Sequence, residues 1–291
     1  MKISVHITFF VKKNLNKEIK KLTKVCRNFL SLSKKTKIFI HTNKKIKFNK
    51  KNMHFIYHNL SAEDPFKLSW KCRPLMLRQK DEYDYFIYSE DDIIFNRKNF
   101  IYWLKFKNMC KKNRLNLGFL RTEVSNKDKK LVSTDQNKKL TKYLLIRKKR
   151  FAILNNPYCA MWIYDQQEFK KFIRSKFWDL NDWRGVNAFT RLYTREKSAV
   201  GWHGLNMNRY LATVIPINRQ KVHPGSLIRH QSNNYASGNM IDLKINNILS
   251  KNLKFFKPIQ HSKIDTFIKE VKFFVYLKFR FNFKNLKKIF T

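Results

Sequence analysis

The sequence lacks the features that identify several classes of protein. Four cysteines are present and lie far apart: Cys26, Cys72, Cys110 and Cys159. Their spacing excludes a CxxC zinc site and the dense disulfide framework of a small secreted domain, so a reducing cytoplasm is the expected compartment. No apolar run approaches the roughly 20 residues that a membrane-spanning helix needs. The apolar N-terminal segment Met1–Val11 has no small-residue cleavage site, which argues against a signal peptide.

Acidic residues are also scarce. The 291 residues include 20 Asp and Glu against 63 Lys and Arg, which gives a formal net charge of +43. A basic chain of this kind favours nucleic acid, anionic lipid or a phosphorylated substrate as a partner. Because Lys, Asn, Ile and Phe are enriched together, compositional drift in an AT-rich genome is the alternative explanation.

Alternating strands and helices predict an α/β fold. Ile3–Val11 is a nearly continuous β-prone run, as expected for a buried parallel strand, and Lys37–His41 and Met53–His58 predict two more strands. After the first strand, apolar residues recur at helical spacing opposite lysines: Ile19, Leu22, Val25, Cys26 and Phe29. With 43% hydrophobic residues and 26 Phe, the chain can form a sizeable core.

The middle of the chain continues this alternation. Asp64 can cap a helix that begins at Pro65 and is kinked at Pro74. Tyr85–Tyr88 predicts a short core strand. Residues 126–150 are polar and rich in lysine with little periodicity, which predicts a loop, a hairpin or a mobile lid.

Three adjacent acids, Glu90, Asp91 and Asp92, follow the predicted strand Tyr85–Tyr88. Neighbouring carboxylates repel one another, and the usual compensation is a hard divalent cation bound by oxygen ligands. Glu90 and Asp92 project to the same side of an extended backbone, so one can hold a metal while the other contacts a ribose or a metal-bound water. A solvated turn, or neutralisation of nearby lysines, is the alternative.

The stretch Tyr85–Ile93 resembles the acidic DxD signature of GT-A glycosyltransferases, in an E-D-D variant. Other stretches look similar to a poorly characterised group of these enzymes: Asp64–Arg73, Trp103-Leu104, Gly118–Glu123 and His230–Tyr235. The resemblance covers residues 1–240 approximately. It implies a Rossmann-like α/β fold of the GT-A type, a mixed sheet flanked by helices. The implied activity moves a sugar from a nucleotide-sugar donor to a glycan or lipid-linked acceptor.

In enzymes of this type the acidic motif holds Mn²⁺ or Mg²⁺ against the donor's diphosphate, and the metal neutralises the charge of the leaving group. By position, Asp92 matches the metal-binding acid. Glu90 and Asp91 match the positions nearer the ribose and the metal-bound water. Because the motif departs from D-x-D to E-x-D, the division of roles between Glu90 and Asp92 stays open, and both are candidate metal ligands.

Histidine and arginine side chains are further candidates for this site. The resemblance implies a late histidine that completes the metal shell or contacts the diphosphate. His230 is the first candidate, because imidazole suits manganese, and His223 and His203 are alternatives. Arg121 follows a predicted core strand, Leu117–Leu120, so it could contact a phosphate beyond the strand end or pair with Glu123.

Two acids are candidates for the catalytic base. Asp182 lies beside Trp178 and Trp183, where an acceptor sugar could stack on an indole while the carboxylate accepts a hydroxyl proton. Glu196 is the other candidate. Either acid could equally cap a helix or form a surface ion pair.

The C-terminal part is basic and rich in Phe, and we expect a helical tail over residues 246–291 after a catalytic domain over residues 1–245. Such a tail is typical of an interfacial helix on anionic lipid, with a packing helix as the alternative. The expected location is therefore the cytoplasm, with peripheral association at the inner face of the membrane as a further hypothesis.

Other classes of function stay open. A nucleic-acid-binding protein would explain the charge, although the sequence has no helix-turn-helix, zinc, KH or RRM signature, and no specific nucleic acid is expected. A metal-dependent nuclease would explain both the acids and the charge, although it usually needs further converging acids. A non-catalytic membrane-surface protein is the third alternative.

Overall fold

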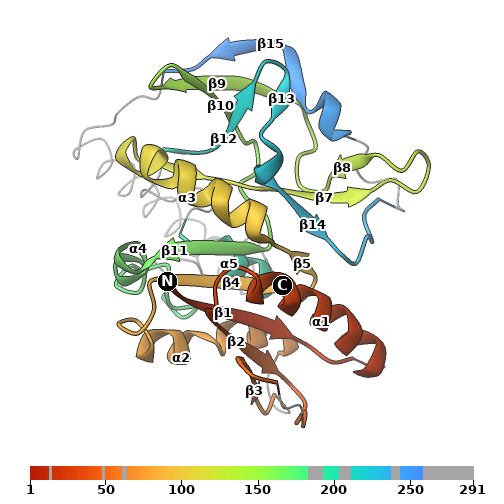
Figure 1. Cartoon of the computed structure of the whole chain (residues 1–291), viewed down its shortest axis with the longest axis vertical. Coiled ribbons are helices and arrows are strands. Elements are labelled where there is room, and N and C mark those ends of the chain that lie inside the picture. The colour runs from red at the N-terminus through yellow and green to blue at the C-terminus, as the bar shows by residue number, and fades with distance from the viewer. Residues whose placement is uncertain are drawn as a thin grey trace, which may run out of the picture.

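Figure 1 shows the computed structural model, in which two large layers of β-sheet lie one above the other with helices between and around them. The residues that the structure describes are 1–12, 15–47, 50–60, 64–182, 193–202, 211–236 and 243–257.

The first sheet is mixed and contains the N-terminal strands. Its members, in spatial order, are β11 (Met161–Asp165), β4 (Tyr85–Glu90), β1 (Lys2–Phe9), β2 (Lys35–Thr42) and β3 (Met53–Tyr57). β1, β2, β3 and β4 run parallel, and β11 pairs antiparallel with β4 at the edge. Helix α1 (Leu15–Leu30) connects β1 to β2 and buries the apolar face that its sequence spacing predicted. The mixed α/β class expected from the sequence is confirmed.

The connection from β3 to β4 contains two short helices where the sequence predicted one. The 3-10 helix η1 (Pro65–Trp70) is capped by Asp64, whose carboxylate accepts a hydrogen bond of 2.9 Å from the backbone N of Phe66. Helix α2 (Arg73–Arg78) then begins with Pro74 in its first turn. Because a proline ring cannot continue the hydrogen bonding of a preceding turn, the chain breaks into two helices here and is not merely kinked.

The second layer contains two sheets. A six-stranded sheet has the order β13-β12-β10-β9-β15 with β6 beside β12, and a four-stranded sheet has the order β5-β14-β7-β8. Their bounds are β5 (Ile93–Ile94), β6 (Leu115–Leu117), β7 (Leu120–Val124), β8 (Leu131–Ser133), β9 (Leu140–Ile146), β10 (Lys149–Ile153), β12 (Ala212–Asn218), β13 (Lys221–Val222), β14 (Leu227–His230) and β15 (Leu249–Phe255). Strands β8 and β9 lie within residues 126–150, so part of this lysine-rich stretch is a hairpin with β10. The strand expected at residues 117–120 is two strands, β6 and β7, separated by Gly118 and Phe119.

The helices join the two layers. Helix α3 (Arg97–Lys112) lies between them and begins at Asn96, whose side chain caps it. The largest apolar core includes α1, α3, one face of the first sheet and one face of the six-stranded sheet. A second, aromatic core lies on the opposite face of the first sheet, where α4 (Gln166–Phe172) and α5 (Thr194–Val200) pack. Short 3-10 helices η3 (Pro224–Ser226) and η4 (Ile245–Asn247) complete the described elements.

The C-terminal region departs from the expectation of a helical tail in its first part. Strand β15 pairs with β9, and Leu249 belongs to a core on the six-stranded sheet. Residues 258–291 lie outside the described residues, so the helical tail and its boundary stay predictions. Within the described part of the chain, no helix is long and apolar enough to cross a bilayer. All four cysteines fall in this part, and each is buried and free.

Candidate functional site

The acidic cluster lies where the strand order of the first sheet reverses. From β1 the sheet extends through β2 to β3 on one side, while β4 lies on the other side of β1. In open α/β sheets such a reversal leaves a crevice at the carboxyl ends of the two central strands, and ligands bind there. Because β4 ends at Glu90, the three acids lie at this crevice.

A cavity of about 550 Å³ occupies this position. Thr8 and Phe9 contribute to its wall from the carboxyl end of β1, and Ser69 contributes from η1. The charged side chains that line it are Lys12, Glu18, Lys21, Glu90, Asp91, Asp92 and Arg195. The volume is typical of small-molecule sites, which measure roughly 300–1,000 Å³.

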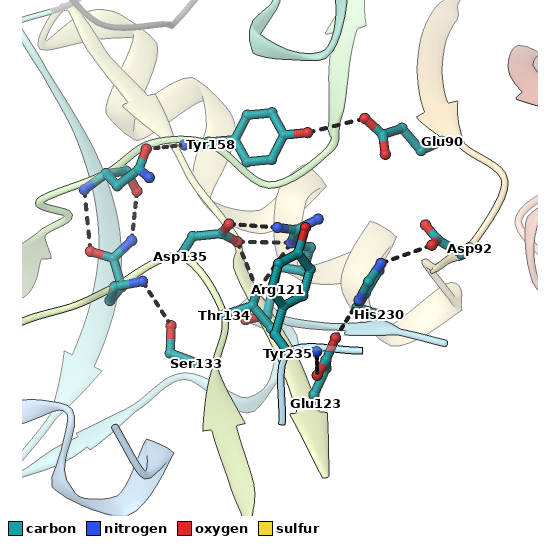
Figure 2. A network of polar contacts seen from close by, with 12 residues as sticks. Glu90, Asp92, Arg121, Glu123, Ser133, Thr134, Asp135, Tyr158, His230 and Tyr235 are labelled. Atoms are coloured by element: carbon teal, nitrogen blue, oxygen red, sulfur yellow. Dashed lines mark hydrogen bonds and ion pairs between the residues drawn. The ribbon is translucent and has the colours of Figure 1, made fainter. Parts of the chain in front are cut away.

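Glu90 is buried and held from two sides. The hydroxyl of Tyr158 donates a hydrogen bond of 3.0 Å to Glu90 Oε1 (Figure 2). Arg195 Nε lies 3.7 Å from the same oxygen. Burial raises the pKa of Glu90, and Asp92 adds to this effect, while Arg195 and Tyr158 oppose it. Glu90 is therefore a fixed carboxylate whose charge depends on its neighbours.

Asp92 presents one oxygen to the protein and leaves the other unpaired. Its Oδ2 accepts hydrogen bonds from Ser232 Oγ at 2.7 Å and from His230 Nε2 at 2.8 Å. Its Oδ1 is buried and has no hydrogen-bond partner within the described part of the chain. Burial alone would raise the pKa of Asp92, but the bonds from His230 and Ser232 outweigh it and lower the pKa. For Asp91, burial and the charges of Asp92 and Glu90 raise the pKa to about 8.

His230 joins Asp92 to a second carboxylate, Glu123. The ring bonds to Asp92 through Nε2 and to Glu123 through Nδ1, as Figure 2 shows. Glu123 is fully buried, and it also accepts a bond of 2.8 Å from the backbone N of Tyr235. Burial would lower the pKa of His230, but the bonds to both carboxylates raise it. His230 thus contacts the motif as a hydrogen-bond donor, and its role as a metal ligand stays a prediction.

Arg121 lies behind the acidic cluster. Its carboxylate partner is Asp135 rather than Glu123: Nη2 lies 2.7 Å from Asp135 Oδ1, and Nε donates to Oδ2 at 2.9 Å. The guanidinium carbon lies 5.2 Å from the centre of the Tyr158 ring and 5.4 Å from that of Tyr235. Arg121 is buried, so these contacts fix Tyr158, which in turn contacts Glu90. A direct contact of Arg121 with phosphate stays a prediction.

The residues of the motif suit a hard cation in part. Among the described residues, no group of three or more His, Cys, Asp or Glu side chains is arranged to hold a metal ion. The unpaired Oδ1 of Asp92 and the neighbouring carboxylate of Asp91 are nonetheless oxygen ligands of the kind that Mg²⁺ and Mn²⁺ take. Mg²⁺ commonly takes only one or two carboxylates and completes its shell with substrate phosphates and water. The site therefore fits a metal that arrives with a phosphorylated ligand.

The other candidates lie away from the cavity wall or outside the described residues. The carboxylate of Glu196 accepts a bond of 3.0 Å from the backbone N of Tyr193 and caps α5. The backbone N of Asp182 donates to Asp179 O at 3.4 Å. Neither acid is among the described residues that line the cavity, and the role of either as catalytic base stays a prediction.

Of the two alternative histidines, His223 Nδ1 accepts a bond of 3.0 Å from the backbone N of Gly225, and its ring lies against Tyr102. This is a structural role at the start of η3. His203 and Trp183 lie outside the described residues.

Sequence reasoning assigned no role to Tyr158, Asp135, Ser232 or Arg195. Tyr158 and Glu90 are 68 residues apart, and no local pattern connects them. Ser232 was within reach, because it lies two positions after His230 in a polar stretch. Arg195 was within reach as well, as the neighbour of Glu196 in a basic segment.

Comparisons with known proteins found only weak likeness. No protein-family model matches the chain, and no curated protein matches it. A crystal structure of Staphylococcus aureus TarS 1–349 is 12% identical with a TM-score of 0.38, covering 80% of this chain and 61% of that one. TarS in complex with UDP-GlcNAc is 11% identical with a TM-score of 0.31, covering 59% of this chain and 47% of that one. The chain thus spans less than two thirds of these proteins, and a likeness of this size is too weak to indicate a shared activity.

Proposed function

We propose that the protein is a metal-dependent glycosyltransferase of the GT-A type that moves a sugar from a nucleotide-sugar donor to a glycan or lipid-linked acceptor. The position of the acidic cluster supports this proposal, because Glu90, Asp91 and Asp92 line a cavity at the crevice between β1 and β4. The resemblance of residues 85–93 to the DxD signature supports it as well. A nucleotide sugar is of a size that this cavity can accept.

One observation carries the proposal: Asp92 Oδ1, a buried carboxylate oxygen at the wall of the cavity, has no hydrogen-bond partner among the residues that the structure describes. A buried charged oxygen without a partner is costly unless a ligand satisfies it. We assign this ligand as Mn²⁺ or Mg²⁺, held by Asp92 with Glu90 or Asp91 nearby. When bound, the metal would neutralise the charge that develops on the leaving diphosphate.

The surrounding residues would orient this constellation. His230 and Ser232 hold Oδ2 of Asp92 and so fix the direction of Oδ1. Tyr158 holds Glu90, the guanidinium of Arg121 lies over the ring of Tyr158, and Asp135 holds Arg121. Asp182 and Glu196 remain the candidates for the base that accepts the acceptor's proton. We place the reaction in the cytoplasm, with residues 258–291 as a hypothetical contact to the inner face of the membrane.

A donor panel tests the proposal. The native chain and Asp92→Ala are incubated with individual nucleotide sugars and Mn²⁺, and the released nucleotide is measured, with EDTA as the metal-free control. We expect release from one donor, loss with EDTA, and a fall of about a hundredfold or more in Asp92→Ala, because transition-state charge would lose its counterion. Asp128→Ala, which removes an acid of the exposed turn after β7 that pairs with Lys244, is the matched control and should keep full activity.

Two results would contradict this assignment. Equal nucleotide release by the native chain and by Asp92→Ala would exclude a role of the motif in catalysis. No release from any donor, together with manganese-dependent cleavage of DNA or RNA, would instead identify a metal-dependent nuclease.

A further inference from the structure

Arg195 lines the cavity, and most of its hydrogen-bond donors have no partner among the described residues. Its side chain is 50% exposed, and its Nε lies 3.7 Å from Glu90 Oε1, which is an ion-pair distance but too long for a hydrogen bond. In the part of the chain that the structure describes, no other hydrogen bond or ion pair of this side chain is found. The nearby charge of Glu90 raises the pKa of Arg195, so the guanidinium stays positive.

The backbone that carries Arg195 is held firmly on both sides. Trp70 Nε1 donates a bond of 2.9 Å to the carbonyl of Thr194, the residue before it. Three residues later, Ser198 Oγ donates to Ser69 O at 2.8 Å, and Trp162 Nε1 donates to Ser198 O at 3.1 Å. These bonds tie α5 to η1 and β11. The guanidinium therefore extends from a fixed backbone.

The cavity wall contains other cations near the three acids. Lys12 and Lys21 line the cavity together with Arg195. A carboxylate cluster that served only to neutralise one arginine would not require them. Cations and carboxylates on one wall instead suit a ligand that brings both negative phosphate oxygens and a positive metal ion.

We propose that Arg195 binds a phosphate group of the donor directly, beside the metal held by the acidic motif. The inference rests on the proposed function and adds a specific phosphate-binding residue to it. The planar fork of a guanidinium matches two phosphate oxygens, and such charge-assisted bonds are roughly twice as strong as neutral ones. Lys21 supports the same anion from α1.

The test measures binding and does not depend on turnover. Affinities of the full chain for inorganic pyrophosphate and for UDP, GDP and ADP are determined by titration calorimetry with Mn²⁺ present, for the native protein, Arg195→Gln and Arg174→Gln. Arg174 is an exposed arginine outside the cavity wall, so it matches the loss of charge. We expect Arg195→Gln to bind pyrophosphate and the preferred nucleotide about tenfold or more weakly. Arg174→Gln should bind like the native chain.

A double-mutant cycle separates direct phosphate contact from simple neutralisation of Glu90. If Arg195 acts only on Glu90, its loss should have no effect in a Glu90→Gln background, and the inference is overturned. If it binds phosphate, the tenfold loss persists there. Arg195→Lys, which keeps the charge but not the planar fork of the guanidinium, should give an intermediate affinity. It also replaces Arg195→Gln as the test variant if Arg195→Gln does not fold.

Failure of this inference is distinguishable from failure of the proposed function. If the native chain binds neither pyrophosphate nor any nucleoside diphosphate, the proposed function itself is contradicted. If the native chain binds one of them and Arg195→Gln binds it equally well, only the role of Arg195 is wrong.

Discussion

At the scale of single residues, the side-chain amide of Gln79 sets the direction of the hydrogen bonds in a row of histidines on the first sheet. Gln79 Oε1 lies 3.0 Å from His6 Nε2, and His6 Nδ1 lies 3.0 Å from His41 Nε2. His41 Nδ1 lies 2.9 Å from His58 Nε2. Because the amide oxygen of Gln79 can only accept, His6 and His41 each donate through Nε2 and accept through Nδ1, and His58 donates through Nε2. This ladder of three histidines requires the rings of His6 and His41 to be neutral.

The ladder predicts acid sensitivity. Burial lowers the pKa of His6 to about 3 and holds that of His41 well below its usual value. Below about pH 6.5 the unfolded chain therefore binds protons that the folded chain does not, so the free energy of unfolding falls as the pH falls. At about pH 5 each of these two histidines should lower the free energy of unfolding by about 2 kcal/mol, relative to its value above about pH 6.5.

His6→Phe tests the contribution of one of these histidines, because a phenyl ring can keep the stacking on Phe39. Urea unfolding of the native chain and the variant is compared at about pH 7.5 and about pH 5. The variant should be less stable than the native chain at both pH values, since His41 loses a partner. The fall in its free energy of unfolding from about pH 7.5 to about pH 5, however, should be smaller than that of the native chain by about 2 kcal/mol. His54→Phe, on the exposed side of β3, is the control. An unchanged pH dependence in His6→Phe would disprove the role of the ladder.

The residues of the candidate site were predictable only where the signal lies in neighbouring positions of the sequence. Glu90, Asp91 and Asp92 stand out because they are adjacent acids between apolar residues in a basic chain. The pairing of His230 with Glu123 joins positions 107 residues apart, and it depends on the parallel pairing of β7 with β14. Arg121 shows the same limit: its partner Asp135 follows β8, a strand that the polar sequence did not indicate.

At the scale of elements, α5 depends on the glycine that ends it. Gly201 has φ +64, and a Cβ atom there would lie 2.7 Å from the ring of Trp162 and 2.8 Å from Tyr164 Oη. Both rings are buried in the aromatic core, so neither can move freely. Gly201→Ala should therefore reduce the free energy of unfolding by about 1–3 kcal/mol. Urea denaturation measures this, with Lys171→Ala on exposed α4 surface as the control, and an equal effect of both would contradict the argument.

Elements were predictable where one physical signal dominates. β1 to β4 follow from apolar, β-branched and aromatic runs, and α1 follows from its helical spacing. The proline signal at Pro74 was recognised but read as a kink within one helix, whereas η1 and α2 are separate helices. The split of β6 from β7 was missed because it depends on tertiary packing: Gly118 lies against the side chain of Thr213, on β12. For the lysine-rich strand β9 the sequence left a loop, a hairpin and a lid open, because only Leu140, Leu144 and Ile146 of its seven residues are buried and the apolar pattern is weak.

At the scale of the whole molecule, the site is formed by both layers. Glu90 ends a strand of the first sheet, whereas His230 and Glu123 belong to the four-stranded sheet of the second layer. The chain passes from the first sheet to the second layer at Asp91 and Asp92, between β4 and β5, and β5 then pairs with β14. A shift of one layer against the other would therefore change the contacts of Asp92. The geometry of the acidic motif thus depends on the apolar core that the two layers share.

The net charge of +43 predicts the response of the whole fold to salt. Many lysines face solvent beside other cations, such as Lys20 and Lys24, one turn apart on α1. Their repulsion destabilises the compact state, and raising the salt from about 0.1 M to about 1 M shortens the screening length from about 10 Å to about 3 Å. We expect the thermal midpoint to rise with NaCl.

Lys24→Glu is the matched variant, because it replaces a repulsion with an attraction to Lys20 at helical spacing. Its free energy of unfolding should exceed that of the native chain by about 0.5 kcal/mol at the lower salt concentration, and this gain should largely disappear at the higher one. Lys24→Gln should show about half of the gain. Differential scanning calorimetry of the three chains measures both effects. A thermal midpoint that falls with NaCl in the native chain would mean that attractive ion pairs, such as those of Asp165 with Lys107 and Lys111, outweigh the repulsion.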